Sequence, residues 1–259
     1  MHCNFRWNIV QYAWENLSSQ KRSAVMDKIT VITGATSGYG LATACKCKEN
    51  GDTVIIVSRS AEKVAAVVQE YGFSDGFVLD VTDYAGWITL KEHILSRYGR
   101  IDVLVNNAGT GVQIAELSEQ TKESIDAAIA INLNGVIYGS QIFGEVMKKQ
   151  GDGIIINISS VCARHCWAGW SVYAAAKAGV LNFTKSLYVE LQPYGVRATC
   201  IIPAAASTGF NTKSGIPENE QSLTPEDIAG AVYYAASQPK GVCVEEMTVW
   251  GTSQVVQPL

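Results

Sequence analysis

The sequence predicts an α/β protein in which helices cover both faces of a largely parallel β-sheet. Three observations favour this fold class. Strand-like and helix-like segments alternate along the whole 259-residue chain. Strand-like segments such as TVIIVS at 53–58 and GIIINI at 153–158 are apolar throughout, which is typical of strands buried on both faces. Helix-like segments are followed by glycines, as at Gly51, Gly72 and Gly99, and glycine commonly ends a helix.

About seven strands and the helices between them can be placed by composition. The predicted strands cover residues 28–33, 53–58, 76–79, 101–105, 153–158, 196–202 and 246–250. The predicted helices cover residues 41–50, 61–71, 84–98, 118–139 and beyond, and 171–191. A last helix begins after Thr224, with Pro225 at its first position and Asp227 three residues after the cap.

The chain shows no linker, repeat or low-complexity tract, so we expect one domain from residue 26 to residue 259. Residues 1–25 lack the apolar run of a signal peptide and precede the first strand. We expect them to form a poorly ordered N-terminal extension. A targeting peptide is the weaker alternative.

Composition excludes several classes of partner. The net charge is −4 and no long basic run is present, which gives no reason to expect nucleic acid or an anionic membrane as partner. No apolar stretch reaches membrane-spanning length. Seven cysteines suggest no disulfide framework, and reduced cysteines favour a cytoplasmic location. Cys162, His165 and Cys166 cluster, but no second ligand pair stands at zinc spacing, so we expect no metal.

A glycine-rich turn follows the first predicted strand. Residues 33–40 read TGATSGYG, with glycine at positions 34, 38 and 40. Glycine allows a sharp turn and a close backbone approach to a pyrophosphate, and the following helix directs its N-terminal amides at that phosphate. An ordinary turn is the alternative for such a segment alone, but its place in an α/β alternation favours a dinucleotide site. The candidate residues are Gly34, Thr36, Ser37, Gly38, Tyr39 and Gly40.

The end of the second predicted strand bears on the choice of cofactor, because this strand usually meets the adenosine ribose. It ends in Ser58 and Arg59 and carries no carboxylate. A guanidinium group binds a 2′-phosphate in bidentate fashion or stacks on adenine. We therefore expect NADP as the cofactor, with NAD as the alternative if Arg59 is only a solvated loop residue.

Tyr173 and Lys177 lie four residues apart in a predicted helix, so they share one helix face. A phenol is a poor base at neutral pH, and a neighbouring cation lowers its pKa. That is the property required of a group that exchanges a proton with a carbonyl oxygen. Ser160 follows the fifth predicted strand, where ligands bind in such sheets. Many helices carry such a Tyr–Lys pair by chance, so the other motifs have to decide.

The motifs together resemble those of the short-chain dehydrogenase/reductase family. TGATSGYG resembles the family's TGxxxGxG turn, Asp80–Val81 its adenine-contacting pair, and residues 106–109 its NNAG motif. The resemblance covers residues 28 to about 208 and implies a doubly wound, Rossmann-type fold that binds a nicotinamide dinucleotide. It adds these expected cofactor contacts: Asp80, Val81, Asn107, Ala108, Gly109, Tyr173, Lys177, Pro203, Ala206 and Thr208.

The resemblance also implies roles for four residues. Tyr173 exchanges the proton with the substrate oxygen, and Lys177 binds the nicotinamide ribose and tunes the phenol. Ser160, chosen over its neighbour Ser159 by family spacing, orients the substrate oxygen. Asn132 holds a water that connects Lys177 to solvent. Family members commonly form homodimers or homotetramers through their two long helices, here those beginning near residues 118 and 171.

The sequence departs from the family at one turn and leaves the substrate open. Ala204 stands where the family usually has glycine after the sixth strand, which puts the geometry of that turn in doubt. Substrate specificity would lie in residues 111–113, 165–170 and 210–217, where Trp167 and Trp170 suggest an apolar wall or, equally, a subunit contact. The segment 244–250 loosely resembles the branch that contains NADP-dependent hydroxy-acid and serine/threonine-type dehydrogenases.

These observations predict an NAD(P)(H)-dependent oxidoreductase that transfers a hydride between nicotinamide and a small carbonyl or secondary alcohol substrate. The alternative is a non-catalytic dinucleotide-sensing regulator of the same fold. The presence of both Tyr173 and Lys177 speaks against that alternative.

Overall fold

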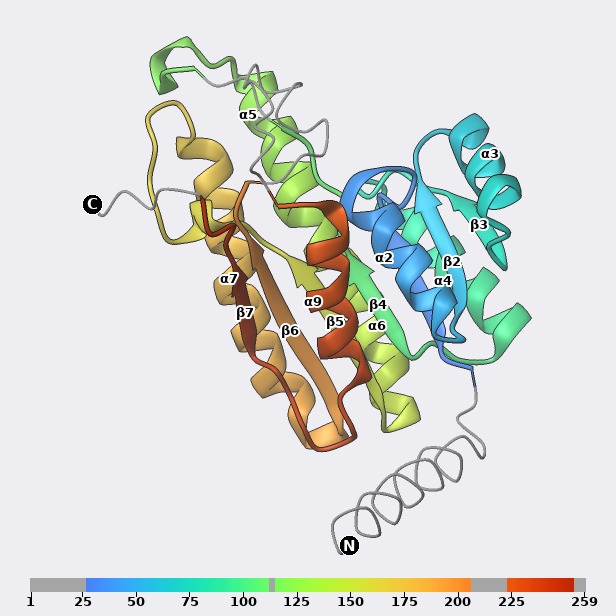
Figure 1. Cartoon of the computed structure of the whole chain (residues 1–259). Helices are drawn as coiled ribbons and strands as arrows, with labels where there is room; N and C mark the ends of the chain where they lie inside the picture. The colour runs from blue at the N-terminus through green and yellow to red at the C-terminus, as the bar shows by residue number, and fades with distance from the viewer. Residues whose placement is uncertain (1–26, 112–114, 206–222, 254–259) are drawn as a thin grey trace, which may run out of the picture.

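The computed structural model describes residues 27–111, 115–205 and 223–253. Within them a seven-stranded sheet has the order β3-β2-β1-β4-β5-β6-β7, and every neighbouring pair is parallel (Figure 1). The predicted fold class is confirmed. The strands are β1 (Ile29–Thr33), β2 (Thr53–Ser58), β3 (Asp75–Val78), β4 (Val103–Asn106), β5 (Gly153–Ile158), β6 (Val196–Pro203) and β7 (Glu246–Val249).

The helices alternate with these strands. They are α2 (Gly38–Glu49), α3 (Ala61–Tyr71), α4 (Tyr84–Tyr98), α5 (Lys122–Ile129), α6 (Gly135–Gln150), α7 (Ser171–Leu191) and α9 (Pro225–Ser237). The α9 helix begins with the predicted cap, since the Thr224 hydroxyl accepts from the Asp227 amide and the Asp227 carboxylate accepts from the Thr224 amide.

The long helix predicted from residue 118 is divided in the structure. A short 3₁₀ turn covers Leu117–Glu119, and α5 begins at Lys122 because the Thr121 hydroxyl caps it by accepting from the Ser124 amide. A π-helical segment, Ala130–Asn134, then separates α5 from α6. Composition could not locate this widened turn, because all of its residues are compatible with an ordinary α-helix.

Two apolar cores lie on opposite faces of the sheet. On one face, Ile56 of β2 and Ile154 of β5 pack with residues of α2 and α9, such as Ala44 and Val232. On the other, their strand neighbours Ile55 and Ile155 pack with α4, α6 and α7. Figure 1 shows α2 and α9 together on one side of the strands. Successive strand residues thus alternate between the two cores, which explains why the strands are apolar throughout.

The order of the strands fixes where a ligand binds. The chain runs outward from β1 to β2 and β3, then returns to β4 on the other side of β1. The helices that follow β1 and β4, α2 and α6, cover opposite faces of the sheet. The carboxyl ends of the strands at such a reversal of strand order are where ligands bind in open α/β sheets.

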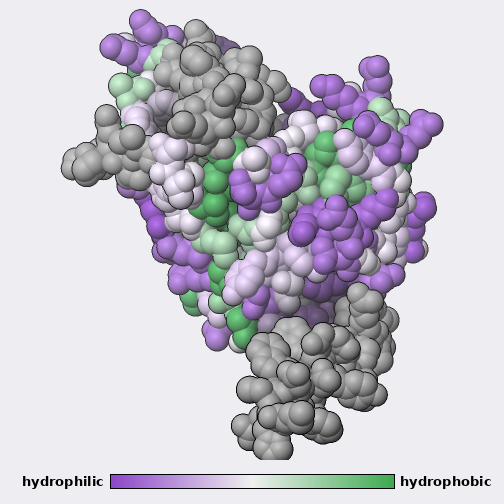
Figure 2. Space-filling view, in the orientation of Figure 1, coloured by the Kyte–Doolittle hydropathy of each residue, from purple (hydrophilic) through white to green (hydrophobic). Residues whose placement is uncertain are grey.

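No helix in the described ranges is both long enough and apolar enough to cross a membrane. On the face of the molecule shown in Figure 2, hydrophobic residues are exposed in separate patches among hydrophilic ones. Such patches are normal on the surface of a folded domain.

Candidate active site

The glycine-rich turn between β1 and α2 is closely packed against the loop after β4. Gly34 has a φ of +67°, and a Cβ atom there would lie 2.9 Å from the Ala108 Cα atom. A Cβ atom on Gly40 would lie 2.5 Å from the Asn107 Nδ2 atom and 2.5 Å from the Gly34 carbonyl oxygen. The two positions therefore require glycine for different reasons: the left-handed backbone at Gly34, and the close approach at Gly40.

Hydrogen bonds hold this turn and the NNAG segment together. The Asn107 side-chain amide donates to the Thr33 carbonyl at 2.8 Å. The Thr33 hydroxyl accepts from the backbone amides of Asn107 and Ala108, both at 3.0 Å. The two motifs that are distant in sequence thus form one rigid unit at the carboxyl ends of β1 and β4.

The N-terminus of α2 fits a pyrophosphate. Ser37 precedes the helix and its side chain makes no capping hydrogen bond, and the first turn contains no acidic residue. The first amides of a helix carry a partial positive charge and have no partner within the helix. With the close glycine packing above, this is an uncapped anion site with room for the backbone of a dinucleotide.

The residues predicted to meet the adenosine lie beyond β2 and β3. Arg59 follows β2 with an exposed side chain, 66% accessible, whose Nη1 atom is 3.9 Å from a carboxylate oxygen of Asp80. The hydroxyls of Thr36 and Ser58 are 3.3 Å apart. Lys63, in the first turn of α3, lines the same cavity. This end therefore carries two cations and one carboxylate.

A single cavity of about 1040 Å³ joins this end to the predicted chemical site. It is lined by these sequence-predicted residues: Gly34, Thr36, Ser37, Gly38, Tyr39, Ser58, Arg59, Asp80, Val81, Asn107, Ala108, Gly109, Asn132, Ser160, Tyr173, Lys177 and Pro203. Gly40 lies behind this wall, against Asn107. Ala206 and Thr208 lie outside the described residues.

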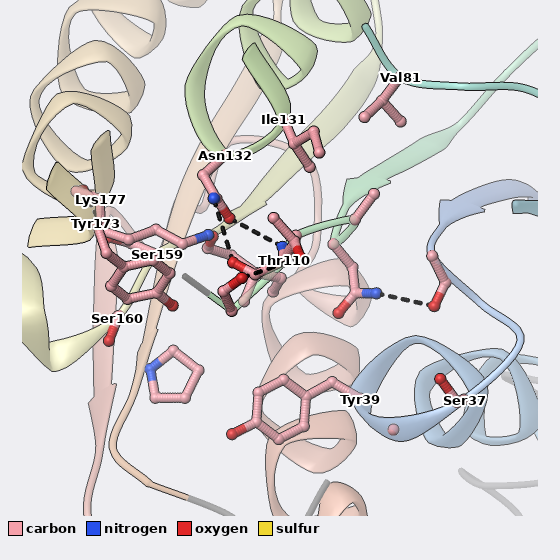
Figure 3. Close-up of a pocket in the computed structure, with 18 of the residues that line it drawn as sticks. Ser37, Tyr39, Val81, Thr110, Ile131, Asn132, Ser159, Ser160, Tyr173 and Lys177 are labelled. Carbon is pink, nitrogen blue, oxygen red and sulfur yellow. Dashed lines mark hydrogen bonds between the residues drawn. The ribbon is translucent and has the colours of Figure 1, made fainter. Parts of the chain in front are cut away.

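Tyr173, Lys177 and Ser160 meet at the end of β5. Tyr173 and Lys177 occupy the first two turns of α7, and the Lys177 ammonium nitrogen lies 5.7 Å from the centre of the Tyr173 ring. That nitrogen donates to the Ile158 carbonyl at 3.0 Å. Figure 3 shows these side chains on one side of the cavity, with Ser37 and Tyr39 of the glycine turn on the other.

The two adjacent serines after β5 have different partners. The Ser159 hydroxyl is buried and donates to the Lys177 carbonyl at 2.8 Å, which fastens β5 to α7. The Ser160 hydroxyl accepts from the Cys162 amide at 3.2 Å and is hydrogen-bonded to Tyr173. Ser160 is thus the serine placed beside the phenol.

Burial sets the protonation of this site. It raises the pKa of Tyr173 above the ordinary value of 10.0, and the hydrogen bond with Ser160 opposes it only in part. Burial also lowers the pKa of Lys177 from 10.5 to about 8. The spacing of Tyr173 and Lys177 predicts that the lysine lowers the pKa of the phenol, but in this site the loss of solvation is the larger effect. Tyr173 is consequently protonated at neutral pH.

Asn132 lies in the π-helical segment and is fully buried. Its side-chain amide nitrogen donates to the carbonyls of Ala128 and Thr110, and its oxygen accepts from the Thr110 amide at 3.1 Å. Gly109 lies between this oxygen and the Lys177 ammonium group, since a Cβ atom there would be 3.1 Å from one and 3.7 Å from the other. Single π-helical turns are frequent at functional sites, and this one brings an asparagine beside the lysine.

The opposite end of the cavity is aromatic. Trp167, Trp170 and Trp250 line it, together with Cys162 and Ser253. The rings of Trp170 and Tyr173 make an edge contact with centres 5.5 Å apart. The prediction of an apolar wall at Trp167 and Trp170 agrees with this placement, while residues 112–113 and 210–217 lie outside the described part of the chain.

At the turn after β6, Ala204 keeps a sheet-type hydrogen bond. The Ala204 amide donates to the Val249 carbonyl at 2.9 Å, which extends the ladder between β6 and β7 by one residue. The Ala204 carbonyl accepts from the Tyr39 hydroxyl at 3.5 Å. The alanine side chain is buried, so the substitution is accommodated within the wall of the cavity.

Four of the residues of the cavity wall that sequence reasoning missed are Ser60, Lys63, Trp250 and Ser253. Ser60 and Lys63 begin α3, directly after the strand that carries Arg59. Trp250 and Ser253 follow β7. Their signal was positional, because all four lie just beyond the carboxyl end of a parallel strand, where this fold binds ligands.

Among the described residues, no three His, Cys, Asp or Glu side chains are grouped as metal ligands.

Comparisons with known proteins agree with this geometry. The family model of short chain dehydrogenases matches residues 28–219. The 3-oxoacyl-[acyl-carrier-protein] reductase of Thermotoga maritima is 36% identical over 223 residues, which cover 81% of this chain and 90% of that protein.

Two solved structures are also similar. The closed form of a serine dehydrogenase complexed with NADP+ has a TM-score of 0.85 at 28% identity, covering 89% of this chain and 98% of that one. The 3-ketoacyl-(acyl-carrier-protein) reductase of Brucella melitensis complexed with NADH has a TM-score of 0.82 at 28% identity, covering 90% of this chain and 100% of that one. The sheet order, the glycine turn and the Ser–Tyr–Lys arrangement, together with these matches, establish that the chain belongs to the short-chain dehydrogenase/reductase family and is an oxidoreductase.

Proposed function

We propose that this protein is an NADP(H)-preferring oxidoreductase that transfers a hydride between nicotinamide and a carbonyl or secondary alcohol substrate. One observation carries the proposal: the uncapped helix N-terminus and the Ser160–Tyr173–Lys177 group line opposite sides of the same cavity. A dinucleotide whose phosphates lie at α2 then extends toward the group that handles the proton. When bound, the nicotinamide supplies or accepts the hydride.

Tyr173 supplies the proton in the reducing direction. Its raised pKa keeps the phenol protonated at neutral pH, so it is ready to donate to the substrate oxygen. Ser160, hydrogen-bonded to the phenol, holds the same oxygen in place. In the oxidising direction the ionised form of Tyr173 accepts the proton of the substrate alcohol, and because its pKa is raised this direction needs a higher pH.

Lys177 and Asn132 support the phenol from behind. The Lys177 nitrogen is fixed by the Ile158 carbonyl and has further donors for the nicotinamide ribose. With a pKa of about 8, it exchanges its own proton readily near neutral pH. We propose that Asn132, across Gly109 from this nitrogen, holds the water through which Lys177 communicates with solvent.

The preference for NADP over NAD rests on the charges at the adenosine end. Arg59 and Lys63 line the cavity there, and a 2′-phosphate provides the anion that two such cations bind. The serine dehydrogenase with NADP+ supports this choice, while the reductase with NADH keeps NAD as the alternative.

The cofactor preference is tested by fluorescence titration of NADPH and NADH against the wild type and Arg59→Ala. We expect the substitution to weaken NADPH binding by about ten- to a hundredfold, as for the loss of a charge-assisted pair, and to leave NADH binding unchanged. Lys122→Ala is the control, because it removes one positive charge from the exposed start of α5. Equal affinities for both dinucleotides in the wild type would contradict the NADP preference, and tighter NADH binding would reverse it.

The chemistry is tested by Tyr173→Phe with a panel of ketones and NADPH. We expect kcat/KM to fall at least about a hundredfold, as for the loss of a general acid, while NADPH binding persists. A wild type that binds NADPH but turns over no carbonyl or alcohol would favour the dinucleotide-sensing regulator instead.

We also propose a cytoplasmic homodimer or homotetramer, assembled through the exposed surfaces of α5, α6 and α7 as the family commonly does. Light scattering on the full chain during size-exclusion chromatography measures the assembly directly, and a monomer at micromolar concentration would contradict it.

A further inference from the structure

We propose that the substrate is uncharged and carries an aromatic ring or a comparably bulky apolar group, which binds against Trp167, Trp170 and Trp250. This inference rests on the proposed function and adds the class of substrate to it.

The three indoles converge from segments that are far apart in the chain. Trp167 and Trp170 belong to the loop between β5 and α7, whereas Trp250 directly follows β7. The His165 ring joins the two groups, with its centre 6.1 Å from that of Trp167 and 5.5 Å from that of Trp250. Loops after two different strands therefore build one aromatic wall, which is the construction expected of a binding surface at the strand ends.

This wall begins at the reacting group. The Trp170 ring stands at 67° to the Tyr173 ring, with centres 5.5 Å apart. A substrate whose carbonyl oxygen meets the Tyr173 hydroxyl places the groups on its carbonyl carbon beside Trp170. Aromatic and aliphatic groups gain most from such a surface, because indole faces favour ring stacking and the burial of apolar area.

Charge separates the two ends of the cavity. Among the described lining residues, the charged side chains are Arg59, Lys63, Asp80 and Lys177. The first three lie at the β2–β3 end of the sheet, away from β7, and Lys177 belongs to the catalytic group. A carboxylate or phosphate on the substrate would find no described lysine or arginine lining the cavity among the indoles, since His165 packs against Trp167 and Trp250 and does not itself line the cavity. Burying an unpaired charge is costly.

The wall is also open to a ligand. Trp167 is 37% exposed in the structure without a bound substrate. Large apolar side chains that face a cavity lose contact with water when a ligand covers them, and this stabilises the complex. The competing explanation, that these indoles form a subunit contact, predicts no effect of substrate on them.

The test compares three substrate classes with the full-length enzyme and NADPH: an aryl methyl ketone, an aliphatic methyl ketone of similar reactivity, and a 2-oxo carboxylate. We expect kcat/KM to be at least about tenfold higher for the aryl ketone than for the aliphatic one, and lowest for the carboxylate. A preference for the carboxylate would overturn the proposal.

Two variants assign the preference to the wall. Trp170→Leu and Trp167→Leu should each lower kcat/KM for the aryl ketone about tenfold or more, with a smaller change for the aliphatic ketone, and Trp170→Phe should restore most of the loss. Tyr234→Ala, which truncates an exposed aromatic side chain on α9, is the control for a general effect of surface truncation. An equal loss for both ketones would contradict the assignment.

Binding provides a readout independent of turnover. Calorimetric titration of the aryl ketone into enzyme saturated with NADP+, which cannot reduce it, should show binding that weakens in Trp170→Leu and Trp167→Leu. If the enzyme reduces aliphatic ketones but shows neither this binding nor the aryl preference, the substrate class is wrong and the proposed function stands. If no carbonyl substrate is turned over and NADPH does not bind, the proposed function itself fails.

Discussion

The two ends of the cavity are built from different materials. Where we propose that the cofactor's pyrophosphate binds, the wall is mainly backbone: glycines in a tight turn, uncapped helix amides and an asparagine that bonds main-chain carbonyls. The substrate end is made of large side chains, with three indoles from two separate loops. The pyrophosphate of a dinucleotide is the same whichever substrate is used, so backbone geometry can fix its site. Side chains on loops, by contrast, allow substrate specificity to change without altering the fold.

The difference predicts unequal tolerance to substitution. At the cofactor end a single added methyl group meets closely packed atoms and displaces the turn, while at the substrate end we expect a changed side chain to alter selectivity and leave the fold intact. The following changes test this contrast, from the largest expected effect to the smallest.

Gly40→Ala should have the largest effect. Its new Cβ atom would lie 2.5 Å from both the Asn107 Nδ2 atom and the Gly34 carbonyl oxygen, so the turn must shift away from its position at α2. We expect NADPH affinity, measured by fluorescence titration, to fall at least about a hundredfold, or about 2.7 kcal/mol.

Gly230→Ala is the matched control for this change. A Cβ atom at Gly230 in α9 would meet nothing within 4 Å, and alanine favours a helix by up to about 1 kcal/mol over glycine. We expect unchanged NADPH affinity and a slightly higher melting temperature. If Gly40→Ala bound NADPH as well as this control does, the backbone argument for the cofactor end would be wrong.

Lys177→Met tests the group where the two ends meet. The folded-state pKa of Lys177, about 8, lies below its ordinary value of 10.5. Below pH 8 the folded protein bears the cost of a buried ammonium group, and this cost is relieved as the pH rises from 8 to 10.5 because the unfolded chain then holds the extra proton. The variant removes this cost at pH 7, roughly 3 kcal/mol, but leaves the Ile158 carbonyl without its donor, which costs about 1–3 kcal/mol at any pH. Its stability relative to the wild type should therefore be highest near pH 7, although it loses activity.

Urea unfolding of both proteins at pH 7 and at pH 10 measures this difference. The stability of the variant relative to the wild type should fall at the higher pH. A difference that does not depend on pH would show that the ammonium group of Lys177 is solvated in the folded protein.

Thr33→Val removes the hydroxyl that joins the glycine turn to the NNAG segment. The amides of Asn107 and Ala108 would each lose an acceptor, so we expect a loss of about 1–3 kcal/mol in stability and weaker NADPH binding. Thr30→Val is the control at the other end of β1, where the hydroxyl bonds Asp52 at 2.6 Å. It should cost stability without affecting NADPH affinity, and an equal effect on both would contradict the link between the motifs.

The two ends of the cavity also differ in how far the sequence predicts them. The glycine turn of the cofactor end can be named from the chain, because a left-handed turn and a close helix approach require glycine within a short, local pattern. Helix α3 and strands β2 and β5 were placed at their observed bounds, since their periodicity and flanking residues are local too.

The features that sequence reasoning missed depend on contacts between distant segments. Trp250 reaches the cavity only because β7 lies beside β6 in the sheet, and the residues around position 250 do not reveal this place in the strand order. The direction of the Tyr173 pKa was wrong because spacing reveals the neighbouring cation but not the depth of burial. The π-helical turn at Asn132 could not be predicted either, because it widens a helix whose composition is ordinary.

Glu246→Gln should have the smallest effect, and it tests whether the substrate end is adjustable. The Glu246 carboxylate on β7 pairs with Arg164, in the loop that carries the indoles, and with Lys185 on α7 at 3.0 Å. These cations lower the pKa of Glu246, so the pair stabilises the protein at neutral pH and this contribution is lost as the pH falls through the lowered value. Because the side chains are partly exposed, we expect a stability loss below about 1 kcal/mol that shrinks in high salt.

The KM for an aryl ketone should rise a fewfold while NADPH affinity is unchanged, because the loop loses an anchor and the glycine turn does not. Glu145→Gln, which breaks an exposed pair with Lys149 on α6, should change neither constant, and a change in NADPH affinity with Glu246→Gln would show that the two ends are mechanically coupled.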